Sequence, residues 1–141
     1  MKGFLLDTNV LSEARKGARA NVRVSTWIRV HRDRLYLSVL VTGEVRRGIE
    51  TIRRRDAVAA TRLERWLREV ETGFEDRILP IDAGVADRWG RLAAERPVST
   101  IDGLLAATAL VHGLTLATRN VRDVAATGVP CVNPFETRIP G

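Results

Sequence analysis

Short apolar runs alternate along this chain with longer segments in which apolar residues recur every three or four positions. The short runs predict buried strands at residues 4–6, 35–38, 78–81, 114–118 and 129–132. The periodic segments predict helices with one buried face at residues 10–15, 22–30, 41–53, 63–73, 85–96 and 99–111. Gly17, Gly73 and Gly113 mark three of the expected helix ends, because glycine readily adopts the backbone of a C-terminal cap.

The alternation of strands and helices indicates an α/β fold. Parallel strands are joined by helical crossovers, which pack on both faces of the sheet. No repeat, linker or low-complexity segment divides the 141 residues, and this length suits one domain with one core. We therefore expect a single domain over residues 1–141 with three layers, α/β/α, around a short, mainly parallel central sheet.

The first predicted strand ends in an acid. Residues 4–6 are apolar, and Asp7, Thr8 and Asn9 follow them directly. Ligands of open α/β sheets bind beyond the carboxyl ends of the strands, so Asp7 is expected at the mouth of such a site. The alternative is that Asp7 only caps the helix that follows, which is a common role for aspartate.

Three further acids occupy comparable positions. Glu44 lies one turn into the helix after the second strand, Asp102 opens an almost wholly apolar helix, and Asp123 follows the fourth strand. Each has a purely structural alternative. Glu44 could pair with Arg47. Asp102 could form a capping box with Ser99, and Asp123 could stand in a cap or a turn.

The four acids together predict a metal site. Because the carboxyl ends of parallel strands share one rim of the sheet, the four carboxylates would stand close together and repel one another. Such clusters usually hold a cation, and an all-oxygen ligand set favours Mg²⁺ or Mn²⁺. Magnesium keeps several waters and leaves coordination positions for phosphate oxygens.

The charge of the whole chain points to a polyanionic partner. The net charge is +6 and the pI is about 10.8. Only two of the 23 basic residues are Lys, and the others are Arg, whose planar fork binds phosphate bidentately. A GC-rich genome would explain the ratio of Arg to Lys, but not the positive sign. A basic protein with an acidic metal site matches a phosphodiester-cleaving enzyme.

Other classes of function fit poorly. Cys131 is the single cysteine, so no internal disulfide or thiolate metal site is expected. No Gly-x-Gly-x-x-Gly or Walker A sequence occurs, and His31 and His112 lack an evident nucleophile partner. The longest uncharged run, residues 103–118, is too short for a membrane helix, and no signal peptide precedes Asp7. We therefore expect a cytoplasmic protein with no membrane partner.

The chain resembles the PIN-domain ribonucleases, specifically the VapC-type toxins of type II toxin–antitoxin pairs in the FitB-like branch. The resemblance covers nearly the whole chain in order. Its motifs are LLDTNVLSE at 5–13, LS at 37–38, GEVRRGI at 43–49, ILP at 78–80, Asp102 with AATA at 106–109, HGLTLATRNVRD at 112–123, VP at 129–130 and NP at 133–134.

This resemblance implies a role for each acid. The family's catalytic, metal-binding quartet corresponds to Asp7, Glu44, Asp102 and Asp123. Asp7 and Asp102 would bind the metal directly, Glu44 would bind it or position a metal-held water, and Asp123 would complete an outer shell or a second metal site. The family's supporting polar positions correspond to Thr8, Thr118 and Asn120.

Two positions depart from the family pattern. Val124 stands where an aromatic residue usually follows the last acid, and the segment between Glu95 and Asp102 is shorter than in many relatives. The first departure could loosen the placement of Asp123, and the second could reshape the rim near Asp102. Neither changes an acid.

The function that the resemblance implies is that of a Mg²⁺- or Mn²⁺-dependent endoribonuclease toxin, which hydrolyses RNA phosphodiester bonds with metal-activated water. Arg46, Arg47 and Arg119 are the candidate RNA-binding residues, because they lie closest in sequence to the acids. The alternative is a non-catalytic RNA-binding or scaffold module that retains the fold.

The resemblance also implies two protein partners, a small VapB-type antitoxin and a second copy of the chain in a homodimer. Three tryptophans fall on predicted helices, Trp27, Trp66 and Trp89. A chain of this size is not expected to bury three indoles together with all of its apolar helix faces. Some of that surface would then form a two-fold contact or a groove for an antitoxin helix.

Overall fold

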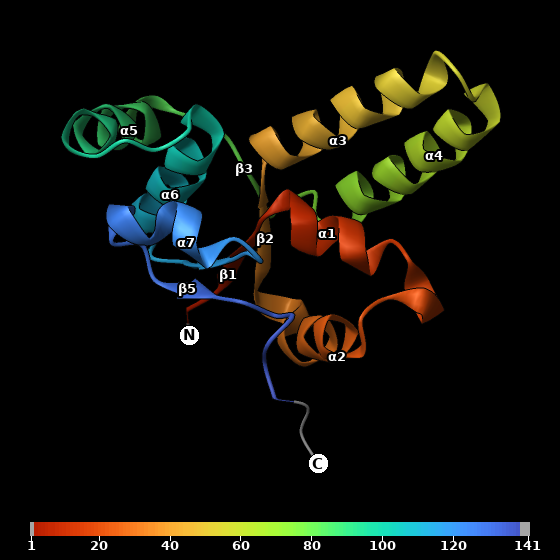
Figure 1. The fold of residues 1–141 in the computed structure, drawn as a ribbon, viewed down its shortest axis with the longest axis horizontal. Coiled ribbons are helices and arrows are strands. Elements are labelled where there is room, and N and C mark those ends of the chain that lie inside the picture. The colour runs from red at the N-terminus through yellow and green to blue at the C-terminus, as the bar shows by residue number, and fades with distance from the viewer. Residues whose placement is uncertain (1, 139–141) are drawn as a thin grey trace.

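The computed structural model describes residues 2–138, which fold into three layers with a central sheet between helices (Figure 1). The described residues contain five strands: Phe4–Leu6 (β1), Leu35–Ser38 (β2), Ile78–Leu79 (β3), Thr115–Ala117 (β4) and Cys131–Val132 (β5). Every neighbouring pair is parallel, and the order across the sheet is β3-β2-β1-β4-β5. The predicted α/β/α architecture with a parallel sheet is therefore confirmed.

The helices agree with the apolar periodicity. The described residues contain seven α-helices: Thr8–Ala14 (α1), Val22–His31 (α2), Val39–Arg53 (α3), Ala57–Gly73 (α4), Ala83–Glu95 (α5), Thr100–His112 (α6) and Val121–Val124 (α7). Helix α4 begins six residues before its predicted start, because the Asp56 carboxylate accepts a hydrogen bond from Ala59 N at 3.0 Å and caps it. Helix α7 was not predicted, since four residues are too few to show a helical period.

The helices lie on both sides of the sheet. In Figure 1, α5, α6 and α7 lie on one side, while α1 and α2 lie on the other. Helices α3 and α4 form a hairpin that extends from the carboxyl end of β2 on the side of α1 (Figure 1). Glu64 on α4 links the two helices of this hairpin. Its carboxylate accepts hydrogen bonds from Arg46 at 2.6 Å and Arg53 at 2.8 Å, both on α3.

The core forms around the sheet and takes in only part of the tryptophan surface. Leu5, Leu37 and Leu116 on β1, β2 and β4 are fully buried. Trp27 packs in the same core, with its ring edge-on to Phe4. Trp66 and Trp89 are only half-buried. Within residues 2–138, no helix is both long and apolar enough to cross a bilayer.

The order of the strands determines where a ligand can enter. The chain runs from β1 to β2 and β3 on one side, and then returns through α5 and α6 to place β4 on the opposite side of β1. The direction of winding therefore reverses between β1 and β4. In sheets of this kind, the crevice outside the carboxyl ends of the two strands at such a reversal is the usual ligand site.

Candidate functional site

Asp7 and Thr118 meet at this reversal point. Asp7 follows β1 and Thr118 follows β4, and the backbone holds them in register because Asp7 N donates to Ala117 O at 2.9 Å. The Thr118 hydroxyl donates to Asp7 Oδ2 at 2.7 Å. Both side chains are buried, with Asp7 9% and Thr118 1% exposed. An oxygen of Asp7 is thus held at the carboxyl end of β1 by a donor from the neighbouring strand.

The same carboxylate caps the first helix. Asp7 Oδ1 accepts a hydrogen bond from Thr8 N at 2.7 Å, so the capping role proposed as an alternative is real. It leaves Oδ2 facing Thr118 and, at 3.4 Å, the side-chain amide of Asn9. The cap and a ligand-binding role therefore use different oxygens of one group.

Burial controls the protonation of Asp7. Its pKa is raised above the ordinary value of 3.8, chiefly because removal from water penalises the carboxylate. The hydrogen bonds from Thr118 and Thr8 act in the opposite direction, while the nearby charges of Asp102 and Glu44 raise the pKa further. The expected repulsion among the acids is thus present for these three groups.

Glu44 reaches the site from α3. Its Oε1 accepts a hydrogen bond from the Thr8 hydroxyl at 2.6 Å, which links α3 to the start of α1. The alternative ion pair with Arg47 does not occur among the salt bridges of residues 2–138. Glu44 is half-buried rather than fully solvated.

Asp102 reaches the site from the first turn of α6. Ser99 Oγ accepts a hydrogen bond from Asp102 N at 3.2 Å, which is one half of the predicted capping box. The return bond from the Asp102 carboxylate to Ser99 N is not among the hydrogen bonds of the described chain, so the cap does not occupy this carboxylate. The next residue is held closely, since a Cβ at Gly103 would lie 3.0 Å from Trp89 Cδ1. The Trp89 indole thus packs directly against the start of α6 beside Asp102.

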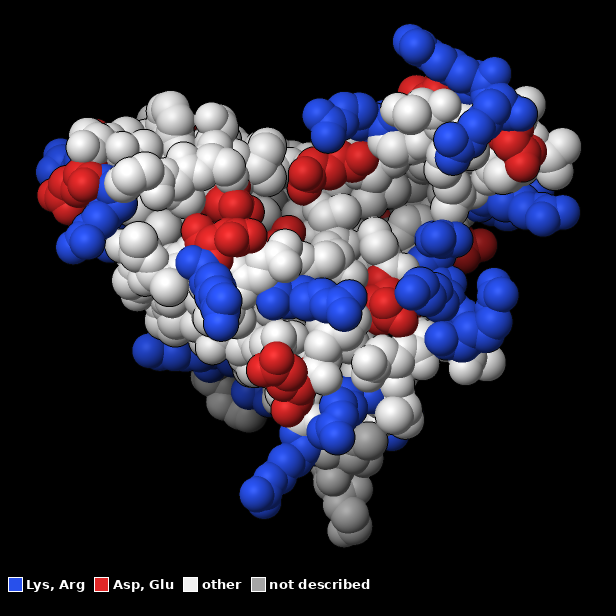
Figure 2. Space-filling model, viewed as in Figure 1, with Lys and Arg blue, Asp and Glu red and all other residues white. Residues whose placement is uncertain are grey.

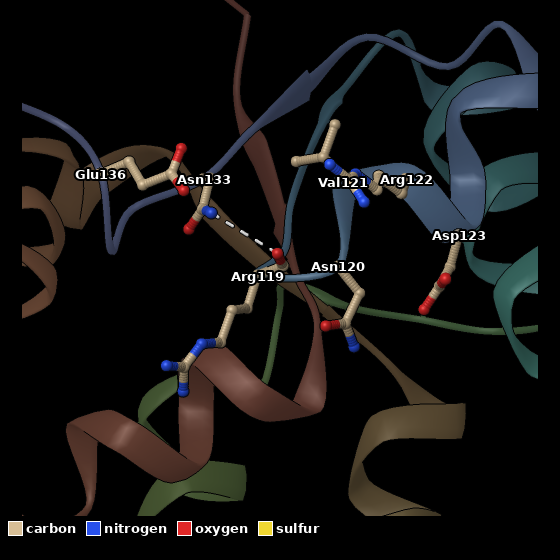
Figure 3. Close-up of a pocket in the computed structure, with 7 residues that line it drawn as sticks. All are labelled: Arg119, Asn120, Val121, Arg122, Asp123, Asn133 and Glu136. Carbon is tan, nitrogen blue, oxygen red and sulfur yellow. Dashed lines mark hydrogen bonds between the residues drawn. The ribbon is translucent and has the colours of Figure 1, made fainter.

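Asp123 is the most exposed of the four acids. It lies on α7 and, together with Asn120, lines a cavity of about 600 Å³ (Figure 3). Figure 3 shows both side chains on the same side of the loop after β4. The adjacent Val124 is buried in the core, so a valine at this position still anchors α7. The acids whose charges raise the pKa of Asp7 are Asp102 and Glu44, and Asp123 is not one of them.

The residues present fit a hydrated divalent cation. Within residues 2–138, no three Asp, Glu, His or Cys side chains converge closely enough to enclose a metal ion. Magnesium, however, is usually held by only one or two carboxylates and keeps several of its waters. A buried carboxylate whose ionised form is disfavoured, with two further acids near it, is the kind of group that such a cation stabilises.

The three candidate RNA-binding arginines stand in different environments. Arg46 is held by Glu64 and, at 3.1 Å, by Glu50, whereas Arg47 is exposed. Arg119 is also exposed, and its guanidinium lies over the Phe135 ring at 4.5 Å from the centroid. Figure 2 shows acidic side chains around the hollow between the two helical sides of the molecule, with Lys and Arg around them.

Sequence reasoning missed one member of the site. The sequence shows Asn9 only as a neighbour of Asp7 and Thr8, whereas in the structure its side chain connects the strands at the reversal point. Its Nδ2 approaches Asp7 Oδ2 at 3.4 Å, and its Oδ1 accepts a hydrogen bond from Arg119 N at 3.1 Å. The signal was its spacing two residues after the acid, which places both side chains on the same first turn.

Comparison with known proteins agrees with this geometry. The family model described as the PIN domain matches residues 4–127. A VapC ribonuclease, Y4jK of Sinorhizobium fredii, is 34% identical over 94% of this chain and 98% of its own length. The structure of FitAcB from Neisseria gonorrhoeae superposes with a TM-score of 0.86 at 31% identity, covering 95% of this chain and 99% of that one. A toxin–antitoxin complex from Klebsiella pneumoniae has a TM-score of 0.74 at 26% identity, covering 96% and 100%.

The match by the family model extends over most of the chain. It includes the four acids, Thr118 and the strands β1 to β4. The strands that carry Asp7 and Thr118 therefore lie inside the matched region. The chain belongs to the PIN-domain family.

Proposed function

We propose that this protein is a divalent-metal-dependent endoribonuclease and the toxin of a VapBC-type toxin–antitoxin pair. The observation that carries the proposal is the buried Asp7 carboxylate at the reversal point of the sheet, with the charges of Glu44 and Asp102 beside it. A structural cap alone would not need two further acids near it. The name of the similar VapC ribonuclease supports the reaction class.

Each side chain of the site has a definite task in this proposal. Asp7 and Asp102 would hold Mg²⁺ or Mn²⁺, which would supply positive charge against the phosphoryl oxygens and lower the pKa of a nearby water. Glu44, fixed by the Thr8 hydroxyl, would accept the proton that the attacking water loses. Thr118 fixes the orientation of the Asp7 carboxylate through its bond to Oδ2. Asp123 and Asn120 border the approach of the RNA chain.

A small antitoxin fits a hollow that leads to the acids. Half-buried Trp66 and Leu63 of α4 line a cavity of about 450 Å³ with Arg15 of the segment after α1. A second cavity continues from these residues to Thr8 and Glu44. A helix of the antitoxin lying in this hollow could place an arginine against the carboxylates, because a guanidinium pairs well with groups that would otherwise hold metal.

The first prediction concerns the acids. Asp7→Asn and Asp102→Asn should each abolish RNA cleavage in the presence of Mg²⁺, because each removes a charged metal ligand while keeping its shape. Thr118→Val removes the donor that orients Asp7 and also the acceptor for the Asn120 N–H at 3.0 Å, so cleavage should fall by about 10- to 100-fold. Rates are measured on a labelled RNA, with circular dichroism as the folding control. Wild-type rates in either acid variant would reject the assignment of that acid as a metal ligand. Failure of the wild type itself to cleave RNA would favour a non-catalytic module.

The second prediction concerns stability without metal. Because the folded-state pKa of Asp7 is raised, its contribution to stability is fully present below its ordinary pKa and is lost as the pH rises through the raised value. In a chelator at pH 7, Asp7→Asn should therefore melt at a higher temperature than the wild type, and the difference should shrink towards pH 4.

Millimolar Mg²⁺ or Mn²⁺ should raise the melting temperature of the wild type, because a ligand that binds only the folded state stabilises it. The Asp7→Asn protein should lack most of this response. An Asp7→Asn protein that melts below the wild type at pH 7 in chelator would show that the buried charge does not cost stability.

The third prediction separates the three arginines. Binding of RNA is measured in chelator as a function of salt. Arg47→Ala and Arg119→Ala should each weaken binding. Arg47→Ala should also reduce the slope of log K against log salt by about 0.7, the value for one phosphate contact to a single strand. Arg46→Ala should mainly lower the melting temperature, because Arg46 is engaged with Glu64 and Glu50. Equal effects of all three on RNA affinity would contradict this division.

The fourth prediction concerns assembly. We expect a homodimer at micromolar concentration by sedimentation velocity, and inhibition by a small protein encoded upstream. Trp66→Ala should weaken binding of that protein without reducing RNA cleavage, since Trp66 lines the hollow that leads to Glu44 but makes no hydrogen bond to the acids among the described residues. A monomer would remove the dimer. An inhibitor bound equally well by the wild type and Trp66→Ala would remove the hollow as its site.

A further inference from the structure

The cavity that Asp123 and Asn120 line also carries polar groups to which metal-dependent cleavage gives no role. It has a volume of about 600 Å³, within the range of about 300–1,000 Å³ that is typical of small-molecule sites. It lies where the chain leaves β4 and β5, beyond the carboxyl edge of the sheet (Figure 3). Its lining consists of Arg119, Asn120, Val121, Arg122, Asp123, Asn133 and Glu136.

The charges of this lining do not favour a phosphate. Two arginines are balanced by two acids, Asp123 and Glu136, so the formal side-chain charge is zero. A phosphate site would concentrate donors and exclude carboxylates. A nucleobase edge, in contrast, presents donors and acceptors side by side, and is read by arginine, asparagine and carboxylate groups in combination.

Several of the lining groups are available to a ligand. Among the hydrogen bonds of residues 2–138, none engages the side chains of Asn120, Arg122 or Glu136, and all three residues are exposed. Asn133 is committed to the fold, since its Nδ2 donates to Arg119 O at 3.4 Å and its Oδ1 accepts from Phe135 N at 3.0 Å (Figure 3). The pocket thus has a rigid floor and free polar groups at its rim.

Arg119 supplies a flat surface for stacking. The central carbon of its guanidinium lies over the Phe135 ring, 4.5 Å from the centroid, and this contact helps to hold the group in place. Bases of single-stranded RNA stack on guanidinium planes of this kind. The Arg119 backbone is held from both sides, because its N–H donates to Asn9 Oδ1 at 3.1 Å and its carbonyl accepts from Asn133. Asn9 in turn contacts Asp7. The position of Arg119 is therefore fixed relative to the candidate catalytic carboxylate.

We propose that this cavity binds one unpaired nucleobase of the RNA next to the scissile phosphate and thereby selects the cleavage sequence. The inference rests on the proposed nuclease function and extends it to the choice of substrate. The base stacks on Arg119, and its edge bonds with Glu136 and the other free rim groups. The ligand class is single-stranded RNA, because a base within a duplex cannot enter a pocket and stack on a side chain.

The test uses equilibrium binding, so it does not depend on cleavage. A short, fluorescently labelled single-stranded RNA is titrated with the full-length protein in chelator, and anisotropy gives the affinity. Each nucleotide is replaced in turn by an abasic one. For the wild type, one position should show a loss of affinity of about 5- to 100-fold, the usual effect of losing a base–side-chain stack.

Two variants ask whether this loss arises in the cavity. Arg119→Lys keeps the charge but removes the stacking plane, and Glu136→Gln removes the acceptor charge at nearly constant shape. Both should abolish most of the abasic penalty at that one position. Arg88→Lys, the same substitution at an exposed arginine of α5 outside the cavity, should keep the full penalty. Melting temperatures show whether each variant is folded.

The outcomes separate the two proposals. An abasic penalty that is absent in the wild type, or equal in the wild type and both variants, would overturn the base-binding pocket even if the protein cleaves RNA. Failure of the wild type to cleave RNA with Mg²⁺ or Mn²⁺ would overturn the nuclease, while the anisotropy result still decides the pocket. If cleavage occurs, sequencing of the RNA ends should show that Glu136→Gln alters the base preferred beside the cut.

Discussion

The hydrogen bond from the Thr118 hydroxyl to Asp7 Oδ2, 2.7 Å long, is the contact on which the rest of the site depends. It joins the ends of β1 and β4 at the place where the sheet reverses its direction of winding. Without a donor from the neighbouring strand, a carboxylate this deeply buried would protonate or turn towards water. The bond therefore favours the ionised form of Asp7 and fixes the direction of its carboxylate. Glu44 and Asp102 act relative to that fixed point.

The site achieves this at a cost in stability. Burial and the charges of two neighbouring acids disfavour the ionised form of Asp7, while bonds from Thr118 and Thr8 offset only part of that effect. Evolution commonly tolerates such local destabilisation where a ligand will relieve it. The hairpin of α3 and α4 shows the opposite balance, because opposite charges meet there. Glu64 forms salt bridges at the surface with Arg46, Arg53 and Arg68. Arg46 is therefore little available to bind RNA.

Much of the fold could be read from the sequence because its signals are local. Apolar runs located all five strands, and the 3.6-residue period located six of the seven helices. The ends were less accurate. Residues 80–81 were expected to continue β3, but Pro80 has no N–H to donate, and the strand ends at Leu79. Asp56 extended α4 through a cap that apolar periodicity cannot register. The importance of Asp7 was also readable, since a strand that ends in an acid at the sheet's rim is a sequence pattern.

Other features depended on contacts between residues far apart in the chain. Asp7 and Thr118 are separated by 111 positions, so only the strand order reveals that they touch. Sequence proximity to the acids grouped Arg46 with Arg47 and Arg119, but packing of α4 against α3 pairs Arg46 with Glu64, while Arg119 turns onto Phe135. The sequence determined which elements form and which acids stand at their ends, because those signals lie within a few residues. Tertiary structure decided which side chains meet, how far each carboxylate is removed from water and what lines each cavity, because these are properties of neighbours in space.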